Sequence, residues 1–161
     1  MQKITPCLWF DNQAEEVVNF YTTVFKDLKI LEISRYDEEA SKVSGKPVGS
    51  VMTLTFQLFG QDFIALNGGT EFTFSEATSF VVNCDNQDEV DNYWDRLSEG
   101  GEEMQCGWLK DKFGVTWQIT PTILNEMLKD PDPEKSKRAM AAMLTMYKID
   151  IKALKDAYNQ E

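Results

Sequence analysis

The residue types that could carry chemistry in this chain of 161 residues are limited first by the absence of histidine. Without an imidazole, neither a Ser-His-Asp or Cys-His mechanism nor a histidine-based zinc or iron site can be built. Any reaction would have to use carboxylates, lysine, tyrosine, cysteine or a bound cofactor. The three cysteines, Cys7, Cys84 and Cys106, are odd in number and lack metal-like spacing, so we expect buried, reduced and inert thiols. A thiolate nucleophile at Cys7 or Cys106 is the disfavoured alternative, because no histidine is present to lower a thiol pKa.

The charge balance excludes several kinds of partner. The chain has 16 basic and 27 acidic residues, a net charge of −11, which repels phosphate backbones and anionic membrane surfaces. The apolar run Ile4 to Phe10 is too short for a signal sequence, and no later stretch reaches the length of a membrane span. We therefore expect a cytoplasmic protein that binds neither nucleic acid nor membrane.

A repeated motif indicates how the chain positions its functional residues. The stretch Asp11 to Tyr21 reads Asp-Asn-Gln-Ala-Glu-Glu-Val-Val-Asn-Phe-Tyr, and Asp85 to Tyr93 reads Asp-Asn-Gln-Asp-Glu-Val-Asp-Asn-Tyr. In each copy an asparagine follows an apolar strand and a glutamate comes three residues later, which predicts a capping box at a helix start. The two predicted boxes pair Asn12 with Glu15 and Asn86 with Glu89. The chain is predicted to use one module twice.

Hydrophobic periodicity gives the first module the order strand, helix, strand, strand, strand, and the second copy is predicted to repeat that order. The helix after Asn12 has an apolar stripe of helical period, and Ser50 to Phe59 alternates as a half-buried strand. The segment Asp37 to Gly49 lacks apolar periodicity and is interpreted as a mobile loop. The other predicted strands are Ile4–Phe10, Lys29–Tyr36, Asp62–Asn67, Thr78–Cys84, Met104–Leu109 and Val115–Pro121.

From Thr122 onward the sequence becomes helical. We expect one helix from Thr122, a second after Asp132 with Pro133 at its first position, and a third from Asp150. The middle helix has a Met-rich stripe that should pack on its own core rather than on a partner. The stripe consists of Ala139, Met140, Met143, Met146 and Tyr147. The predicted organisation is a paired domain at 1–121, with modules at about 1–70 and 76–121, and a helical extension at 122–161.

The two faces of the predicted strands differ in polarity. The apolar face of each set of strands suits the stripe of its own helix, whereas the polar face would be costly to bury in a dry core. We therefore predict an α+β fold in which two βαβββ modules form a curved mixed sheet with a partly polar concavity, and C-terminal helices follow. Concavities of this kind, typically ~300 to 1,000 Å³, bind small molecules.

Several runs of residues resemble a known family. They are Ile64-Ala65-Leu66-Asn67-Gly68-Gly69, Ser79-Phe80-Val81-Val82-Asn83-Cys84-Asp85, Trp94-Asp95-Arg96-Leu97, Cys106-Gly107-Trp108-Leu109-Lys110-Asp111 and Tyr147-Lys148-Ile149-Asp150-Ile151. They are similar to the PhnB-like branch of the vicinal oxygen chelate superfamily, which includes glyoxalases, extradiol dioxygenases and bleomycin-resistance proteins. Members of this branch are widely labelled 3-demethylubiquinone-9 3-methyltransferases. The resemblance implies the paired βαβββ fold and a homodimer.

The resemblance also implies a metal site or a methyl-donor site, and the residues can be tested against both. Metal-dependent members place one ligand, usually His or Glu, on each of four strands. The equivalent positions here are Thr5 (or Pro6 if the register slips by one), Ala65, Ser79 and Gln118, none of which is a good divalent-metal ligand. The glycine pairs at 68–69 and 100–101 do not form the glycine-rich turn of a methyltransferase. We expect neither a metal nor a cofactor, and we assign no catalytic residue.

The leading hypothesis is a metal-free binding protein for a small, partly aromatic or amphipathic molecule. Trp9 and Trp108 could stack on a planar ligand or merely fill the sheet interior. Arg35 could receive an anion, although a surface pair with an acid at 37 or 38 is favoured. Gln118 and Asn67 could bind a ligand or pair within the fold. The alternative function is an enzyme, either a metal-dependent lyase or isomerase with atypical ligands or the methyltransferase of the family label. The candidate cavity residues are Trp9, Arg35, Thr53, Thr55, Gln57, Asn67, Ser79, Trp108 and Gln118.

Overall fold

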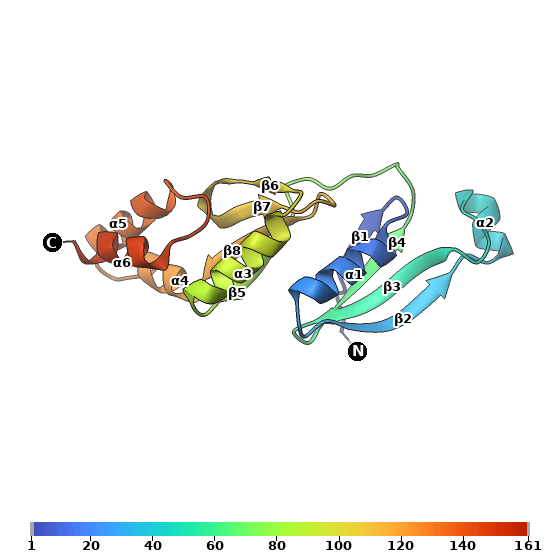
Figure 1. Cartoon of the computed structure of the whole chain (residues 1–161), viewed down its shortest axis with the longest axis horizontal. Helices are drawn as coiled ribbons and strands as arrows, with labels where there is room; N and C mark the ends of the chain where they lie inside the picture. Colours follow the sequence, from blue (N-terminus) through green and yellow to red (C-terminus); the bar gives the residue numbers. More distant parts are fainter. Residues whose placement is uncertain (1, 161) are drawn as a thin grey trace. The chain divides into compact units, whose positions relative to one another are not determined.

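The computed structural model describes residues 2–160, which form two compact units that divide after Thr73 (Figure 1). We call them unit 1 and unit 2. Each unit has the predicted order of strand, helix, strand, strand, strand, and each builds one four-stranded mixed sheet. The prediction of an α+β fold of two βαβββ modules with C-terminal helices is therefore confirmed. No helix among residues 2–160 is long and apolar enough to cross a membrane.

Unit 1 has its four strands in the order β1-β4-β3-β2. The strand β1 is parallel to β4, and the other neighbours are antiparallel. A second, short helix lies between β2 and β3. The elements are β1 (Cys7–Phe10), α1 (Ala14–Val24), β2 (Lys29–Arg35), α2 (Glu38–Ser44), β3 (Val51–Leu58) and β4 (Gln61–Asn67).

Unit 2 repeats this topology with the strand order β5-β8-β7-β6, and β5 is parallel to β8. Its elements are β5 (Phe80–Cys84), α3 (Gln87–Ser98), β6 (Glu102–Glu103), the 3-10 turn η1 (Gln105–Gly107), β7 (Trp108–Lys110) and β8 (Thr116–Pro121). Three helices follow: α4 (Thr122–Leu128), α5 (Pro133–Met143) and α6 (Ile151–Asn159). As predicted, Asp132 and Asp150 cap α5 and α6 by accepting backbone N–H bonds.

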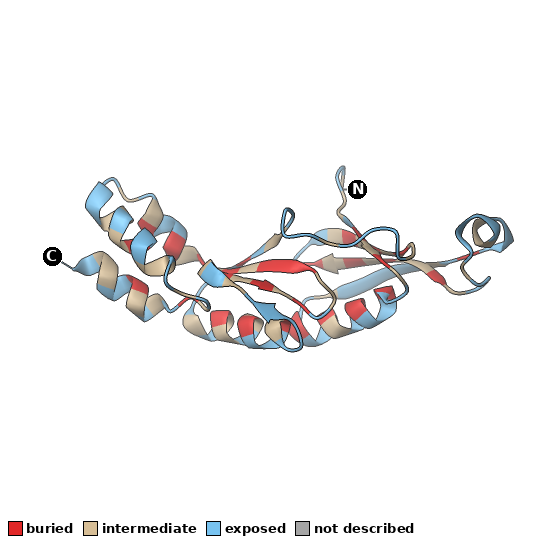
Figure 2. Cartoon of the chain, turned by 90° about the horizontal axis from the view of Figure 1, so that it is seen from above, coloured by how far each residue is buried: buried red, intermediate tan, exposed pale blue. Residues whose placement is uncertain are grey.

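The long helix of each βαβββ module, α1 or α3, buries its apolar stripe against its own sheet (Figure 2). In unit 1 the predicted stripe of α1 is buried over Leu54, Phe56 and Leu58 of β3. In unit 2 the buried α3 residues are Val90, Trp94 and Leu97, while Tyr93 is only half-buried. Each fully buried Leu, Val or Phe contributes roughly 1.5 to 3 kcal/mol to the stability of the fold. The helix of each module covers the apolar face of its sheet in this way, and it leaves the other face uncovered.

The alternation of β3 holds except at Met52. The register shifts between the pairs Ser34–Thr53 and Arg35–Val51, which leaves Met52 as an extra residue in the strand. Val51 then takes the buried place that the pattern gave to Met52, whose side chain is half-exposed.

The segment Asp37 to Gly49 contains the helix α2, so the prediction of a mobile loop was wrong. The Asp37 carboxylate accepts the backbone N–H of Ala40 at 2.8 Å, and Gly45 ends the helix with a φ of 71°. The ammonium of Lys46 pairs with the Asp11 carboxylate at 3.0 Å and donates to the Asp11 carbonyl at 2.7 Å. No residue of α2 is buried, which explains why apolar periodicity gave no helical signal.

The predicted strand Met104–Leu109 is also interrupted. Cys106 and Gly107 have φ values of 62° and 80°, in the left-handed region, and these angles convert the middle of the segment into the turn η1. Of the predicted strand only Trp108 and Leu109 are observed as strand, in β7, and the two residues of β6 lie before the predicted segment. A short outer strand is the result.

The C-terminal helices share a small core of their own. Leu124, Met127, Ala139, Ile149 and Leu154 are buried together, and Met143 and Met146 pack partly against them. The predicted Met-rich stripe therefore packs on its own core at three of its positions. Met140 and Tyr147, at 40% and 51% exposed, do not follow that prediction.

Candidate functional site

The uncovered face of each sheet, opposite its helix, is called the open face below. In unit 1 the register places Trp9 beside Leu66 and Leu66 beside Thr53. Cys7, Ile64 and Thr55 form the next row, and Asp62 and Gln57 the one after. All of these side chains except the exposed Cys7 are half-buried. The predicted candidates Trp9, Thr53, Thr55 and Gln57 thus share one face.

Contacts within the fold already use part of this face. The hydroxyls of Ser34 and Thr53 are 2.6 Å apart, and the amide of Gln57 donates to the Asp62 carboxylate at 2.8 Å. These bonds satisfy polar groups that would otherwise need water or a ligand.

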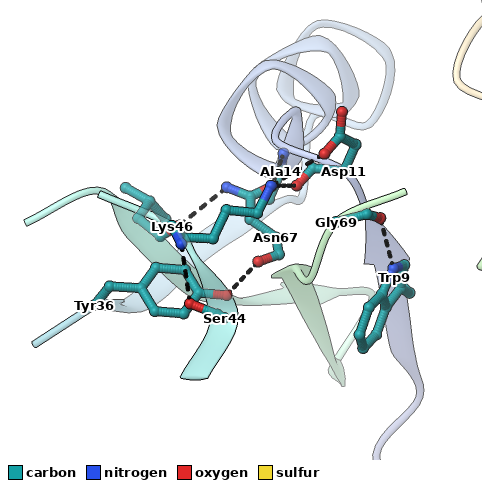
Figure 3. Close-up of polar contacts among 9 residues, drawn as sticks. Trp9, Asp11, Ala14, Tyr36, Ser44, Lys46, Asn67 and Gly69 are labelled. Atoms are coloured by element: carbon teal, nitrogen blue, oxygen red, sulfur yellow. Dashed lines mark hydrogen bonds and ion pairs between the residues drawn. The ribbon is translucent and has the colours of Figure 1, made fainter. Parts of the chain in front are cut away.

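Trp9 is covered by its own unit. Its indole N–H donates to the carbonyl of Gly69 at 2.9 Å (Figure 3). Its ring meets Phe72 edge-on at 4.9 Å between centroids. A Cβ on Gly68 would lie 2.3 Å from the indole, so the ring rests directly on the glycine backbone. This packing favours the structural interpretation of Trp9 over stacking on a ligand.

Asn67 lies on the helix-covered face, where it is 6% exposed. Its side-chain oxygen accepts the N–H of Ala14 at 2.8 Å, its amide donates to Val51 O at 3.1 Å, and its carbonyl accepts the Tyr36 hydroxyl (Figure 3). This position differs from the predicted place in a cavity. Both polar groups of its side chain bond within the fold, so Asn67 is not among the ligand-facing residues.

Asn67 also replaces the predicted cap of α1. That helix begins at Ala14 after Gln13, which makes no side-chain cap bond, so the capping box at Asn12 and Glu15 was wrong. The box of the second copy is largely confirmed. Asn86 accepts the N–H of Glu89 at 3.0 Å, and the Glu89 carboxylate accepts the N–H of Asp85, one residue before the predicted partner.

Arg35 is exposed at the end of β2. Its guanidinium donates to the carbonyl of Gly49 at 3.1 Å. A backbone acceptor holds it rather than Asp37 or Glu38, and the bond ties β2 to the segment that follows α2.

The open face of unit 2 brings three predicted residues together. Gln118 of β8 pairs with Val81 of β5 on one side and with Trp108 of β7 on the other. The Gln118 amide donates to the hydroxyl of Ser79 at 2.9 Å. Trp108 and Gln118 are half-buried and Val81 is 49% exposed. An aromatic ring and a neutral amide therefore lie side by side on an accessible surface.

Asp111 orders the β7–β8 hairpin and was missed by the sequence analysis. It is 2% exposed, and its carboxylate accepts the N–H groups of Phe113 at 2.9 Å and Val115 at 3.1 Å and the indole N–H of Trp117 at 2.9 Å. The signal was an aspartate three residues before Gly114, typical of a turn closed by its own side chain. Asp111 thereby helps to fix the register that sets Trp108 beside Gln118.

The ammonium group of Lys110, on the open face of unit 2, lies near two carboxylates. The Lys110 ammonium contacts the Glu76 carboxylate and lies 3.9 Å from that of Glu102. The hydrogen bond to Glu76 raises the pKa of Lys110, and the same bond lowers the pKa of Glu76. Lys110 is the cross-strand neighbour of Thr116, and among the buried side-chain nitrogen and oxygen atoms of residues 2–160 the Thr116 hydroxyl is the one without a hydrogen-bond partner.

The cysteines are all free, but only Cys84 is buried, so the prediction of buried thiols was wrong for the exposed Cys7 and the half-buried Cys106. Burial raises the pKa of Cys84 to about 12, with Glu89 and Asp85 adding to the effect. Burial also raises the pKa of Cys7. Neither residue is poised as a thiolate.

The donor set does not fit a catalytic divalent ion. Ala65 is fully buried on the helix-covered face, so its assignment to the open face was wrong, and Ile64 takes that place. The row matching Cys7 and Ile64 in unit 2 is Val81 and Gln118, which again lacks a carboxylate. No three His, Cys, Asp or Glu side chains within residues 2–160 gather where they could hold a metal ion.

A methyl donor such as S-adenosylmethionine fits no better. Strand β1 runs into Asp11-Asn12-Gln13, which has no glycine, and each sheet is mixed rather than doubly wound.

A surface cleft of about 450 Å³ lies at the seam between α3 and α6. Its rim has two acids, Asp85 and Asp150, and two bases, Lys152 and Lys155. The charges balance and favour no class of ligand.

Comparison with known proteins places the chain in a family. Residues 2–120 match the family model described as 3-demethylubiquinone-9 3-methyltransferase. A putative 3-demethylubiquinone-9 3-methyltransferase, PhnB protein, from Bacillus cereus is 38% identical, with a TM-score of 0.66 over 75% of this chain and 100% of that one. No curated protein matches.

Two more distant structures share the fold. A protein from Pseudomonas aeruginosa is 18% identical, with a TM-score of 0.60 over 75% of this chain and 98% of that one. The fosfomycin resistance protein FosX from Listeria monocytogenes, complexed with Mn(II) and sulfate, is 15% identical, with a TM-score of 0.54 over 80% and 98%. The chain therefore belongs to the family described as 3-demethylubiquinone-9 3-methyltransferase, the PhnB-like branch of the vicinal oxygen chelate superfamily.

Proposed function

We propose that this protein binds a small, uncharged molecule with an aromatic part on the open face of unit 2, without a metal ion. The observation that carries the proposal is the cross-strand pairing of Trp108 with Gln118. Directly opposed residues on one face of antiparallel strands have Cβ atoms about 4.5 to 5.5 Å apart, so one small molecule can contact both.

The chemistry of this face favours a neutral ligand. Trp108 offers a ring face for stacking, and Gln118, whose amide bonds to Ser79, offers a carbonyl oxygen to a hydroxyl or N–H of the ligand. The nearby Lys110 already interacts with Glu76 and Glu102, so it offers little to an anion. On the open face of unit 1, the Trp9 ring already packs against Gly68 and its indole N–H already bonds to Gly69, so less of it is free to stack on a ligand. This difference favours unit 2 as the binding surface.

Calorimetric titration with 2-naphthol, a planar ring bearing one hydroxyl, tests the proposal. Trp108→Ala should weaken binding about tenfold, because stacking contributes roughly 0.5 to 1.5 kcal/mol beyond the area buried. Gln118→Ala should weaken it less, and Gln57→Ala on unit 1 is the matched control that should leave it unchanged. Equal affinity in the wild type and the Trp108 variant would overturn the assignment.

The alternative is an enzyme, and the family description is the observation that favours it. Metal analysis of freshly purified protein and calorimetry with S-adenosylmethionine separate the two. A stoichiometric divalent ion, or binding of S-adenosylmethionine, would replace the metal-free binding proposal.

A homodimer is the proposed assembly, since the apolar side chains of Ile30, Leu31 and Ile33 on β2 are 42 to 52% exposed. Sedimentation equilibrium tests it, and a monomer at micromolar concentration would contradict it. The cytoplasmic location stays a prediction.

A further inference from the structure

The C-terminal extension, residues 122–160, lies beyond the family match at 2–120, and it is held on unit 2 by side chains of α3. The amide nitrogen of Gln87 donates to the carbonyl of Ile149 at 3.0 Å, and its oxygen accepts the N–H of Ile151 at 2.8 Å. The Lys148 ammonium pairs with the carboxylates of Asp91 and Asp95 at 3.2 and 3.1 Å. We call residues 146–151 the docking segment.

The docking segment also holds the turn that leads into Trp108. The N–H of Cys106 donates to the carbonyl of Met146 at 2.7 Å, and the N–H of Gly107 donates to that of Tyr147 at 2.8 Å. Ile149 is 1% exposed, and a Cβ added to Gly107 would lie 3.0 Å from its side chain. Two consecutive residues of η1 are thus fixed from outside the module.

The geometry of this turn decides how Trp108 enters β7. Cys106 is a non-glycine residue in the left-handed region, a conformation that persists only where surrounding contacts impose it. The two bonds from Met146 and Tyr147 are such contacts. A relaxed turn would change the direction of the chain immediately before Trp108.

We propose that the C-terminal extension is a positioning element for the ligand face, and that Gln87 and Ile149 are its positioning residues. They contact the turn and the docking segment rather than a ligand, and they set the orientation of Trp108 through η1. The consequence for binding rests on the proposed function; the effect on Trp108 does not.

The full-length chain labelled with 5-fluorotryptophan tests the proposal by fluorine NMR. It has four tryptophans, and Trp108→Phe identifies the resonance of Trp108. Ile149→Ala and Gln87→Ala should shift or broaden that resonance and leave that of Trp9 unchanged. Both should weaken 2-naphthol binding about threefold or more, the size expected for an indirect coupling. Ile149→Val should restore most of the wild-type signal.

Leu154→Ala is the matched control, since Leu154 is fully buried in the same small core and belongs to α6. It should lower the stability of the extension and leave the Trp108 resonance in place. An unchanged resonance in both folded test variants overturns the proposal, and so does an equal shift in the Leu154 variant. A shifted resonance in a protein that does not bind 2-naphthol supports the positioning role and refutes the proposed function alone.

Discussion

The two units share one topology, yet they cap their helices with different residues. In unit 1 the N–H of Ala14 is satisfied by Asn67, the last residue of β4, whose partner in the register is Phe10. The matching last residue of β8 is Pro121, paired with Cys84, and proline has no side-chain acceptor. Unit 2 instead caps α3 locally with Asn86 and Glu89. A repeated sequence therefore preserved the strand order without preserving the polar contacts.

The glutamine that follows the asparagine in each copy of the repeat also differs in its contacts. Gln13 precedes α1 and makes no side-chain cap bond, whereas Gln87 holds the docking segment. The outer strands differ as well, with seven residues in β2 and two in β6. In unit 2, the N–H groups of Cys106 and Gly107 bond to the docking segment of the C-terminal extension, whereas in unit 1 the long outer strand β2 pairs along β3.

The largest difference in stability loss between matched substitutions is expected at Gly107 of unit 2 and Gly60 of unit 1, two glycines with the same φ of 80°. A Cβ at Gly107 would lie 2.8 Å from the carbonyl oxygen of Ile119, whereas one at Gly60 meets nothing within 4 Å. Gly107→Ala should lower the free energy of unfolding by about 4 kcal/mol, and Gly60→Ala by about 1 kcal/mol. Urea denaturation measures both, and equal losses would show that the close approach of Ile119 does not constrain the turn.

The hairpin carboxylates should differ next. Asp111→Ala leaves two backbone N–H groups and the Trp117 indole without their acceptor, and it should cost about 3 kcal/mol. Asp62→Ala at the hairpin of unit 1 removes one half-exposed bond to Gln57 and should cost about 0.5 kcal/mol. Thermal unfolding of both variants measures the two losses of stability. A small loss for Asp111→Ala would mean that its three bonds do not hold the hairpin.

The caps provide the third test. Asn67→Ala removes two buried bonds and should destabilise unit 1 by about 2 kcal/mol, and Asn86→Ala should destabilise unit 2 by about 1 kcal/mol. Asn12→Ala should change stability by less than about 0.5 kcal/mol, although Asn12 matches Asn86 in the repeat. Hydrogen exchange at the first turns of α1 and α3 reports the effects separately. Faster exchange in α1 after Asn12→Ala would restore the capping box that the repeat suggested.

The effect that is smallest at neutral pH appears only in the alkaline range and distinguishes Cys84 from Phe10, its counterpart on β1. Burial raises the pKa of Cys84 from 9.0 to about 12. The unfolded chain loses this proton first as pH rises, so the stability linked to it is complete below pH 9 and is lost between pH 9 and about 12. Cys84→Ala should show a shallower fall of unfolding free energy in this window. Parallel pH profiles would rule out a linked thiol.

The sequence predicted the features set by local patterns. The βαβββ order, the apolar stripes of α1 and α3 and the caps at Asp132 and Asp150 follow from periodicity and capping signals. On unit 2, the β7–β8 register sets Trp108 beside Gln118, and the bond from Gln118 to Ser79 brings the third of these candidates to them.

The features that were missed depend on contacts distant in sequence or on backbone angles. Asn67 bonds across 53 residues to Ala14, which no local pattern encodes. Ala65 was assigned one residue out of register, which moves a side chain to the opposite face. The left-handed Cys106 is held by Met146, forty residues later, and α2 has no buried side chain to reveal it.

The capping of α1 by Asn67 has a consequence for synthesis on the ribosome. An isolated helix of 11 residues is marginal in water, and this one lacks a cap until β4 has emerged and paired. The amino-terminal helix should fray in the nascent polypeptide until the whole first module has been translated. Helix α3 has its cap within its own first turn and needs no such delay.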